Sequence, residues 1–300
     1  MEKREKILVT GANGQLGNEF RDLAASFPQF DFFFTTRDEL PVDDQEKVRG
    51  WFAAHQPRFC FNAAAYTAVD NAELVKEKHA VFGVNADAVK MLATVCREND
   101  TRLIHVSTDY VFDGTTSRPY REDDPTHPIN AYGASKLMGE QYALTANPDT
   151  IIIRSSWVYS AYGKNFVKTM LRLMNEKKEI NVVNDQVGSP TYAHDLAGVM
   201  LGIIAKETDG IRQNWQPGIY HYTNEGAISW FDFALAIKEL SGYTGKINPV
   251  SSMEYPTAAR RPAYSVLDTS KIRETFQVKP NSWKESLAVC LTHIRKDQSS

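Results

Sequence analysis

The stretch Val9-Thr-Gly-Ala-Asn-Gly-Gln-Leu-Gly17 decides the fold of this 300-residue chain. It follows a short apolar run at residues 6–10, typical of a buried parallel strand, and it opens a segment with helical spacing at residues 16–25. Glycines at such a junction let the chain turn sharply and let backbone N–H groups approach a pyrophosphate at the helix N-terminus. The stretch therefore predicts the strand, turn and helix that begin a dinucleotide-binding fold.

Strand-like and helix-like segments alternate through the first half of the chain. The predicted strands lie at residues 6–10, 30–35, 58–62, 102–107 and 150–154, and the predicted helices at residues 16–25, 48–55, 81–98 and 131–145. This alternation predicts parallel βαβ units and therefore an α/β fold with a doubly wound parallel sheet of the Rossmann type.

The pattern changes after Trp157, where loops rich in glycine, proline and aromatic residues become frequent. Helices are predicted at residues 165–177, 230–240 and 283–294, and a strand at residues 179–183. We expect residues 1–157 to form an NAD(P)-binding Rossmann domain. Residues 158–300 are expected to form a smaller α/β substrate-binding region that is interleaved with the sheet, with the cleft between the two parts.

Composition and charge limit the classes of partner. The chain is 42% hydrophobic and 24% charged, as in ordinary globular proteins, and its formal charge of -3 gives no reason to expect a nucleic acid or membrane partner. No apolar stretch approaches the ~20 residues of a membrane helix, and the N-terminus has no apolar signal core. Cys60, Cys96 and Cys290 stand far apart in apolar contexts, so we expect reduced thiols in a cytoplasmic protein.

The end of the second predicted strand bears on the type of cofactor. NAD-binding proteins usually have an acidic residue there that binds the ribose 2′-OH, whereas an arginine accommodates the 2′-phosphate of NADP. The strand ends in Phe34-Thr-Thr-Arg37, which favours NADPH. Asp38 and Glu39 follow directly, so NADH stays open. Asp43 is expected near the adenine.

Tyr132 and Lys136 are the candidate catalytic pair. Four residues along a helix return to the same face, so both side chains point into one space. A nearby ammonium favours the phenolate of a tyrosine and brings proton transfer closer to neutral pH. At the end of the preceding strand, Thr108 is placed to donate to a carbonyl oxygen that gains negative charge, and its neighbour Ser107 is the rival. The set predicts hydride transfer to or from a carbonyl carbon.

Longer segments resemble a known family. The spacing Gly-x-x-Gly-x-x-Gly is similar to that of the extended short-chain dehydrogenase/reductase superfamily. Within it, the chain resembles the dTDP-4-dehydrorhamnose reductases in segments that run nearly from end to end. These are Asn62-Ala-Ala-Ala-Tyr-Thr-Ala-Val-Asp70, Ser107-Thr-Asp-Tyr-Val-Phe112, Tyr132-Gly-Ala-Ser-Lys136, Arg154-Ser-Ser-Trp-Val-Tyr159, Asn165-Phe-Val-Lys-Thr-Met-Leu171, Asn184-Asp-Gln-Val-Gly-Ser-Pro-Thr191 and Tyr255-Pro-Thr-Ala-Ala-Arg-Arg-Pro262.

The resemblance implies the reaction and the roles of several residues. NAD(P)H would reduce the C4 ketone of dTDP-4-dehydro-L-rhamnose, the last step of dTDP-L-rhamnose synthesis for cell-surface polysaccharide. Tyr132 would give the proton, Thr108 would hold the oxygen, and Lys136 would orient the cofactor and tune Tyr132. The implied cofactor contacts are Gly14, Gln15 and Leu16 at the pyrophosphate and Ala65, Tyr66 and Thr67 along the cofactor. Further candidate cofactor contacts in the same segments are Gly11, Asn13, Gly17, Ala63 and Ala64. Asp109 and Trp157 would join Thr108 at the sugar nucleotide.

Three further side chains are candidates for the substrate, beside Trp157, whose flat apolar face suits a deoxysugar ring. Arg260 and Arg261 are candidates for the substrate diphosphate, because guanidinium groups match phosphate oxygens. Asn165 begins a predicted helix, so it is a candidate substrate contact with an N-cap role as the alternative. A core tryptophan and a surface basic pair are the corresponding alternatives for the other residues.

No metal site is predicted. Some members of the family dimerise around a magnesium ion held by glutamates. Glu19 matches one of these positions, but the other two fall on His194 and His293. Magnesium prefers oxygen ligands, so this ion is doubtful, and a transition metal is a weaker alternative than ordinary surface histidines. Monomer and homodimer both stay open.

Several rival functions use the same scaffold. A 4,6-dehydratase needs an acid/base pair after the catalytic threonine, but Asp109 is followed by Tyr110, which disfavours elimination. A sugar-nucleotide epimerase or another reductase of the superfamily stays open. A non-catalytic regulatory subunit that binds NADP is disfavoured, because it has no need of Thr108, Tyr132 and Lys136 together.

Overall fold

A six-stranded parallel sheet forms the centre of the computed structural model, which describes residues 4–208 and 215–297. The strands run in the order β2-β1-β3-β4-β5-β10. Their bounds are β1 (Glu5–Thr10), β2 (Phe30–Thr35), β3 (Phe59–Asn62), β4 (Arg102–Thr108), β5 (Ile151–Ser155) and β10 (Gly218–His221). The order reverses between β1 and β3, so the carboxyl ends of these strands mark the crevice where such sheets bind ligands.

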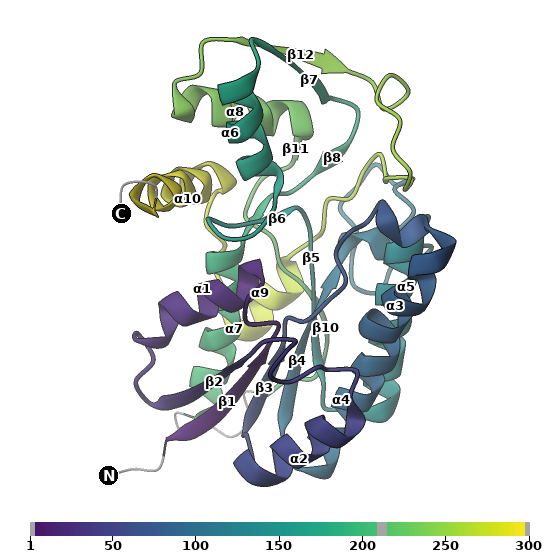
Figure 1. Ribbon diagram of the computed structural model, residues 1–300, viewed down its shortest axis with the longest axis vertical. Coiled ribbons are helices and arrows are strands. Elements are labelled where there is room, and N and C mark those ends of the chain that lie inside the picture. The colour runs from purple at the N-terminus through teal and green to yellow at the C-terminus, as the bar shows by residue number, and fades with distance from the viewer. Residues whose placement is uncertain (1–3, 209–214, 298–300) are drawn as a thin grey trace.

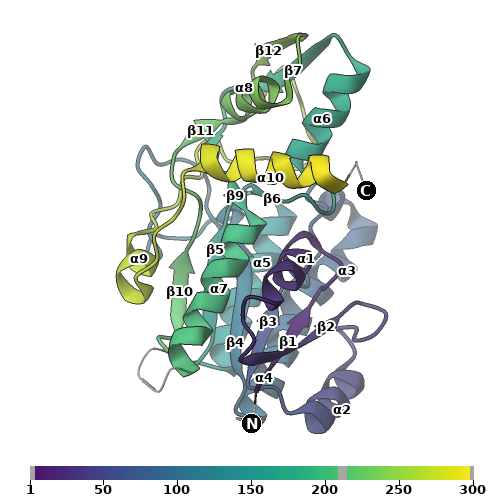
Figure 2. The same ribbon diagram turned by 90° about the vertical axis from the view of Figure 1, so that its left-hand side faces the viewer.

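Helices cover both faces of this sheet (Figures 1 and 2). One face carries α1 (Gln15–Ala24) and α7 (Ala193–Thr208) over an apolar core, and the other carries α2 (Gln45–His55), α4 (Ala88–Glu98) and α5 (Ala131–Ala146). The strands are apolar on both faces, as expected for a sheet buried between two helical layers. The predicted doubly wound α/β fold is confirmed.

A smaller lobe stands above the carboxyl ends of the sheet in Figure 1. It contains α6 (Phe166–Glu176), α8 (Trp230–Ser241), α10 (Trp283–Asp297) and the parallel pair β7 (Glu179–Val183) and β12 (Lys246–Val250), around an apolar core of its own. Short strands tie it together: β6 (Val158–Tyr159) pairs with β9 (Thr191–Tyr192), and β8 (Val187–Gly188) pairs with β11 (Ile228–Ser229). Helix α9 (Ser270–Phe276) lies near β10. No helix in the described part of the chain is long and apolar enough to cross a membrane.

The sequence did not predict α7, β10, β12 and α9 in the second half of the chain, nor the two-residue strands β6, β8, β9 and β11. Helix α7 is apolar on most of its sides, because it is buried between α1, the sheet and the small lobe, so it lacks the stripe that reveals an amphipathic helix. Strand β10 has only four residues and pairs with β5 at the edge of the main sheet. The second half of the chain thus adds a strand, β10, to the main sheet and a helix, α7, to one of its faces.

The long helix predicted at residues 81–98 is divided into three pieces. Helix α3 (Lys78–Phe82) passes through a π-helical turn, η3 (Gly83–Asp87), into α4. The turn presses the Asn85 carbonyl oxygen against α5, where a Cβ on Gly139 would lie 2.1 Å from it. The Asn85 side chain binds both backbone groups of Tyr66 and the Ser135 hydroxyl. Short turns lie at η1 (Asn71–Glu73), η2 (Val75–Glu77) and η4 (Asp109–Val111).

Candidate active site

Two neighbouring clefts open at the carboxyl ends of the parallel strands. The larger cleft, of about 500 Å³, is lined by the end of β4, the start of α5 and residues of the small lobe. The smaller cleft, of about 320 Å³, lies between the glycine loop, the segment after β2 and residues 63–66. Both clefts are lined by Gly14 and by residues 63–65, so one extended ligand can reach from one cleft into the other.

The glycine loop lets three segments approach closely. Gly11 has φ +66°, and a Cβ there would lie 2.7 Å from the Ala64 nitrogen. A Cβ on Gly17 would lie 2.5 Å from the Ala12 Cα, so Gly17 packs the helix rather than lining either cleft. Gly14 is the N-cap of α1, and no side chain of the described residues caps the helix there. The first N–H groups of α1 are therefore available to an anion.

The smaller cleft gathers the residues expected around the nucleotide end of the cofactor. Arg37 and Asp43 both line it, together with Asn13 and Tyr66. The Glu39 carboxylate accepts a hydrogen bond from the Thr36 backbone N–H (2.8 Å), which lowers its pKa and turns it back onto its own loop. Asp38 also lines the cleft, so a basic side chain, Arg37, and an acidic one, Asp38, both lie beside the end of β2.

The start of α5 is fixed by its cap and by a close backbone contact. The Asn130 side chain accepts a hydrogen bond from the Gly133 N–H (2.7 Å) and donates to the Arg260 carbonyl oxygen (2.9 Å). A Cβ on Gly133 would lie 2.1 Å from the Tyr110 carbonyl oxygen, so only glycine allows α5 to approach the end of β4 this closely. This approach brings Tyr132 beside Thr108, and both line the larger cleft.

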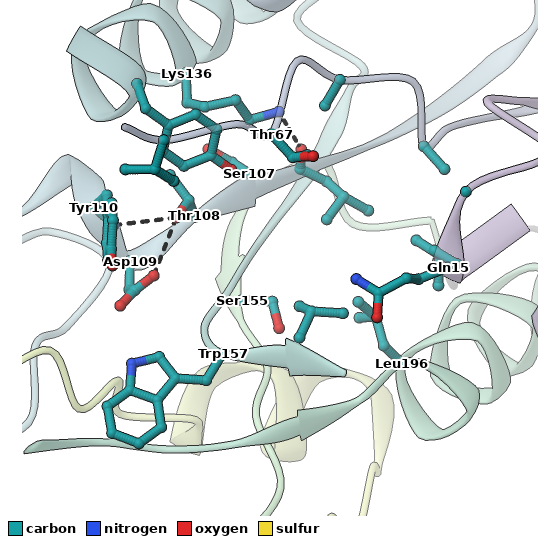
Figure 3. Close-up of a pocket in the computed structure, with 18 of the residues that line it drawn as sticks. Gln15, Thr67, Ser107, Thr108, Asp109, Tyr110, Lys136, Ser155, Trp157 and Leu196 are labelled. Carbon is teal, nitrogen blue, oxygen red and sulfur yellow. Dashed lines mark hydrogen bonds between the residues drawn. The ribbon is translucent and has the colours of Figure 1, made fainter. Parts of the chain in front are cut away.

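The pKa of Tyr132 shifts in the direction opposite to the sequence prediction. Burial raises it to about 12, the carboxyl group of Asp109 adds to the rise, and a hydrogen bond with Thr108 opposes it. Lys136 does not lower it, because the Lys136 amine turns to β4 and donates to the Val106 carbonyl oxygen (2.7 Å; Figure 3). Tyr132 is therefore fully protonated at neutral pH, as a proton donor must be.

Lys136 is itself perturbed by burial. Its side chain is 2% exposed, and burial lowers its pKa to about 8, while Glu140 one turn further along α5 acts in the opposite direction. Glu140 is held in a buried ion pair with Arg154 on β5 (2.7 Å). This pair fixes the helix that carries Tyr132 and Lys136 against the sheet.

The end of β4 separates its two hydroxyl groups as strand alternation predicts. Ser107 donates to Glu140 (2.5 Å) beneath α5, whereas Thr108 donates to the Asp109 carboxylate (3.0 Å). Both residues line the larger cleft, but the Ser107 hydroxyl is held by Glu140. Asp109 is buried, and its Oδ2 has no hydrogen-bond partner among the described residues. Burial raises the pKa of Asp109 to about 7. A buried carboxyl with a free oxygen at the cleft is suited to a polar ligand.

Trp157 lies across the larger cleft from Lys136 (Figure 3). Its backbone has φ +47°, which is rare for a bulky residue. The indole stacks on Trp230 with ring centroids 3.5 Å apart and rests against Gly188, where a Cβ would lie 2.6 Å from the indole Cε2. Neighbouring packing thus holds a strained residue in place at the cleft, a feature often found at functional sites.

Three of the predicted substrate residues lie outside both clefts, and two of them have side-chain partners elsewhere. Asn165 caps α6 by accepting from the Lys168 N–H (3.0 Å), and its amide donates to the Gln15 side chain (2.9 Å), which lines the larger cleft. Arg261 forms an ion pair with Asp70 (2.8 Å). Arg260 is exposed. None of these three is among the residues that line the two clefts.

The larger cleft also contains residues that the sequence did not single out. These are Val69, Val106, Tyr110, Ser155, Val158, Gly163, Lys164, Leu196 and Trp230. Leu196 comes from α7 and Trp230 from the start of α8, so tertiary packing alone brings them to the cleft. Tyr110 had a usable signal, because it stands next to Asp109 in a segment that the sequence had already marked.

The three residues considered for a metal do not form a common site. Both Glu19 oxygens are engaged, one by Ser160 (2.6 Å) and the other by His194 Nδ1 (3.0 Å). His293 Nδ1 instead contacts the Tyr192 hydroxyl (3.0 Å). Within residues 4–208 and 215–297, no group of three or more His, Cys, Asp and Glu side chains is arranged to hold a metal.

The chain is similar to known proteins along nearly its whole length. The family described as RmlD substrate binding domain matches residues 5–296. A dTDP-4-dehydrorhamnose reductase from Aggregatibacter actinomycetemcomitans is 40% identical over 288 residues, 94% of this chain and 97% of that protein. A dTDP-4-keto-6-deoxy-D-glucose reductase from Streptomyces niveus is 36% identical over 299 residues, 98% and 99% of the two. The crystal structure of a dTDP-4-dehydrorhamnose reductase from Bacillus anthracis with NADP has a TM-score of 0.90 at 35% identity, covering 97% of this chain and all of that one.

Proposed function

The chain belongs to the RmlD substrate binding domain family, and from this membership and the geometry of the clefts we propose its reaction. The protein is an oxidoreductase that reduces the C4 ketone of dTDP-4-dehydro-L-rhamnose with NADPH, the last step of dTDP-L-rhamnose synthesis. The observation that carries the proposal is the convergence of Thr108, Tyr132 and Lys136 on a cleft that also reaches Gly14 at the start of α1.

The two clefts fit a dinucleotide cofactor. Gly11 leaves room where a side chain would clash, α1 presents uncapped N–H groups to a pyrophosphate, and Arg37 supplies a cation for a 2′-phosphate. Bound NADPH supplies the hydride. The remaining contacts that we assign to the cofactor come from the glycine loop, from Asp43 and from residues 63–67.

Three residues of this chain perform the proton chemistry. Tyr132 donates its phenolic proton to the oxygen of the ketone as that oxygen becomes an alkoxide. Thr108 donates a hydrogen bond to the same oxygen and stabilises the developing charge. Lys136 orients the cofactor from its position against β4.

Asp109 and Trp157 bind the sugar in this proposal. The free Asp109 oxygen is placed for a sugar hydroxyl, and the indole offers an apolar face to the 6-deoxy position. Arg261 binds the substrate diphosphate only if its guanidinium group leaves Asp70 and pairs with the phosphate instead. Asn165 does not contact the substrate itself but positions the Gln15 side chain by a hydrogen bond. Arg260 stays a proposed diphosphate contact.

The remaining organisation is also proposed. Residues 1–157 bind the cofactor and also supply Asp109 and Trp157 to the sugar, and residues 158–300 complete the substrate side of the cleft. Strand β10 joins the main sheet, and α7 packs on one of its faces. The protein acts on a small nucleotide sugar as a monomer or homodimer. The cytoplasm is the proposed compartment, in keeping with three buried, free cysteine thiols.

Oxidation of NADPH by the purified protein, followed at 340 nm, tests the reaction. We expect turnover with dTDP-4-dehydro-L-rhamnose and a lower rate when NADH replaces NADPH. Preference for dTDP-4-keto-6-deoxy-D-glucose would favour the second candidate substrate, suggested by the Streptomyces niveus relative. Absence of turnover with both ketosugars would refute the proposed function, and a strong preference for NADH would refute the role of Arg37.

A further inference from the structure

A row of buried polar side chains runs beneath Lys136 and crosses three strands. The Thr10 hydroxyl on β1 lies 2.7 Å from Asn62 Oδ1 on β3, and Asn62 Nδ2 lies 3.0 Å from His105 Nδ1 on β4. His105 Nε2 lies 3.4 Å from the Lys136 amine. Thr10 and His105 are 0% exposed and Asn62 is 2% exposed. A buried histidine in a parallel strand is costly unless it is hydrogen-bonded on both nitrogens, as this one is.

The far end of the row touches the cofactor loop. The Thr10 hydroxyl accepts a hydrogen bond from the Ala64 N–H (3.4 Å), and Ala64 lines both clefts. Thr10 also directly precedes Gly11, whose missing side chain permits the approach of Ala64. The row therefore links the backbone that surrounds the cofactor with the amine of Lys136.

His105 is neutral in this environment. Burial holds its pKa well below the usual value, and Lys136 acts in the same direction. A neutral imidazole has one N–H donor and one acceptor nitrogen, so the partners of the two nitrogens depend on each other.

The bonds between Asn62, His105 and Lys136 can therefore run in either of two directions. When Thr10 donates to Asn62 Oδ1, Asn62 Nδ2 donates to His105 Nδ1, and the His105 proton lies on Nε2, facing Lys136. That direction fits a neutral amine, which can accept a hydrogen bond. Rotation of the Asn62 amide by 180° exchanges its oxygen and nitrogen. His105 then donates from Nδ1 to Asn62 and accepts from Lys136 at Nε2, which fits an ammonium.

We infer that His105 is a positioning residue for Lys136: it holds the ammonium against β4 through Nε2, and the direction of the row through Asn62 and Thr10 changes when Lys136 loses its proton. This inference rests on the proposed function only for its effect on turnover. His105 stabilises charged Lys136, which in turn orients the cofactor for ketone reduction.

Few other charges act on this pair. On α5, Glu140 raises the pKa of Lys136, but its carboxylate is neutralised by Arg154 on β5. Asn62 and Thr10, which face His105 from β3 and β1, carry no charge. Because Lys136 titrates at about pH 8, the row should reverse near that pH.

The tautomer of His105 gives a direct test that needs no turnover. Long-range ¹H–¹⁵N spectra of protein labelled in its histidines distinguish a protonated ring nitrogen from a bare one, and His105→Gln assigns the signal. We expect the proton on Nδ1 at pH 6.5 and on Nε2 at pH 9.5, with the change abolished in Lys136→Met. One tautomer throughout this range, or an imidazolium at pH 6.5, would overturn the inference.

Two substitutions separate the contacts of the two ring nitrogens. The amide of His105→Gln reaches the position of Nε2 and keeps a partner for Lys136, whereas the shorter His105→Asn reaches only the position of Nδ1. We expect His105→Gln to keep the alkaline limb of the kcat profile. His105→Asn should move that limb about one pH unit lower, because it removes a hydrogen bond that favours the charged amine.

Thermal unfolding and the Kd for NADPH measured on the same proteins separate this effect from loss of fold. The positioning role would be refuted if both substitutions displaced the alkaline limb equally, or if neither displaced it. A wild-type protein that shows the tautomer change but reduces neither ketosugar would refute the proposed function and leave the link between His105 and Lys136 intact.

Discussion

The smaller and the larger cleft are built from different parts of the polypeptide. Backbone and short side chains from residues 11–66 form most of the smaller cleft, where Gly11 and residues 63–65 lie in close contact. The larger one also contains ionisable and aromatic side chains from residues as far apart as Asp109 and Trp230. The first depends on the absence of side-chain atoms, and the second on burial that changes the pKa values of Asp109 and Lys136. We therefore expect a different kind of substitution to impair each cleft.

Removal of one hydroxyl should have the largest effect in the larger cleft. Tyr132→Phe removes the proposed proton donor, and general acid catalysis contributes about 10²–10⁴-fold to a rate. We expect kcat to fall by that factor, while the Kd for NADPH changes less than about threefold, because the smaller cleft is untouched. Tyr142→Phe, on the same helix but outside both clefts, is the matched control and should keep kcat. Comparable loss in both variants would contradict the role of Tyr132.

A single added methyl group should have the next largest effect, in the smaller cleft. Gly11→Ala places a Cβ at φ +66° and against the Ala64 backbone, which costs about 1–2 kcal/mol for the conformation and about 1–3 kcal/mol for overpacking. We expect a lower Tm and weaker NADPH binding by fluorescence titration.

Gly50→Ala on the exposed face of α2 is the control, because no atom lies within 4 Å of its added Cβ. It should raise stability by about 0.5–1 kcal/mol, since alanine favours a helix interior over glycine. Equal NADPH affinity in the Gly11→Ala variant and the wild type would show that the smaller cleft does not bind the cofactor as proposed.

The same difference explains what the sequence could predict. The smaller cleft lies on consecutive βαβ units, so the glycine spacing and the strand end at Arg37 sufficed to predict it. Tyr132, Lys136 and Thr108 were predicted because helix and strand periodicity determine their directions. Trp230 and Leu196 could not be predicted, because they reach the larger cleft only through packing of the small lobe and of the uniformly apolar α7.

Charge was harder to predict than position. Proximity of a lysine suggested a lowered pKa for Tyr132, but the folded chain turns the Lys136 amine toward β4 and buries the phenol near Asp109, which raises the pKa. The pairing of Arg261 with Asp70 likewise depends on the return of a segment almost two hundred residues later in the sequence.

The pH dependence of kcat should report on the larger cleft, with a smaller effect than the Tyr132 and Gly11 substitutions. The pKa of Lys136 is lowered to about 8, so its ammonium is present below that pH and is lost as the pH rises through it. We expect kcat for ketone reduction to fall about tenfold per unit above this point. Asp109 ionises near pH 7, and its carboxylate raises the pKa of Tyr132, which adds a second limb near pH 7 to the kcat profile. Asp109→Asn should remove this limb and leave only the limb near pH 8. A flat kcat between pH 7 and pH 9.5 would contradict this.

The smallest effect is expected at the sugar end of the larger cleft. Gly188→Ala would press a methyl group on the Trp157 indole, 2.6 Å from Cε2, and overpacking of about 1 kcal/mol corresponds to roughly a fivefold change in an equilibrium. We expect the KM for the nucleotide sugar to rise by that factor, with kcat and the Kd for NADPH kept. Gly198→Ala on α7, which has open space for a Cβ, is the control and should leave the KM unchanged.

Transfer of label from the nicotinamide to the sugar tests the central claim most directly. The purified protein is incubated with dTDP-4-dehydro-L-rhamnose and NADPH that carries deuterium at both C4 positions of the nicotinamide ring, in ordinary water, and the product is examined by NMR. We predict dTDP-L-rhamnose with deuterium at C4 of the sugar and a hydroxyl proton from solvent. A product with hydrogen at C4, or cofactor that keeps all of its label while the substrate is consumed, would contradict the account.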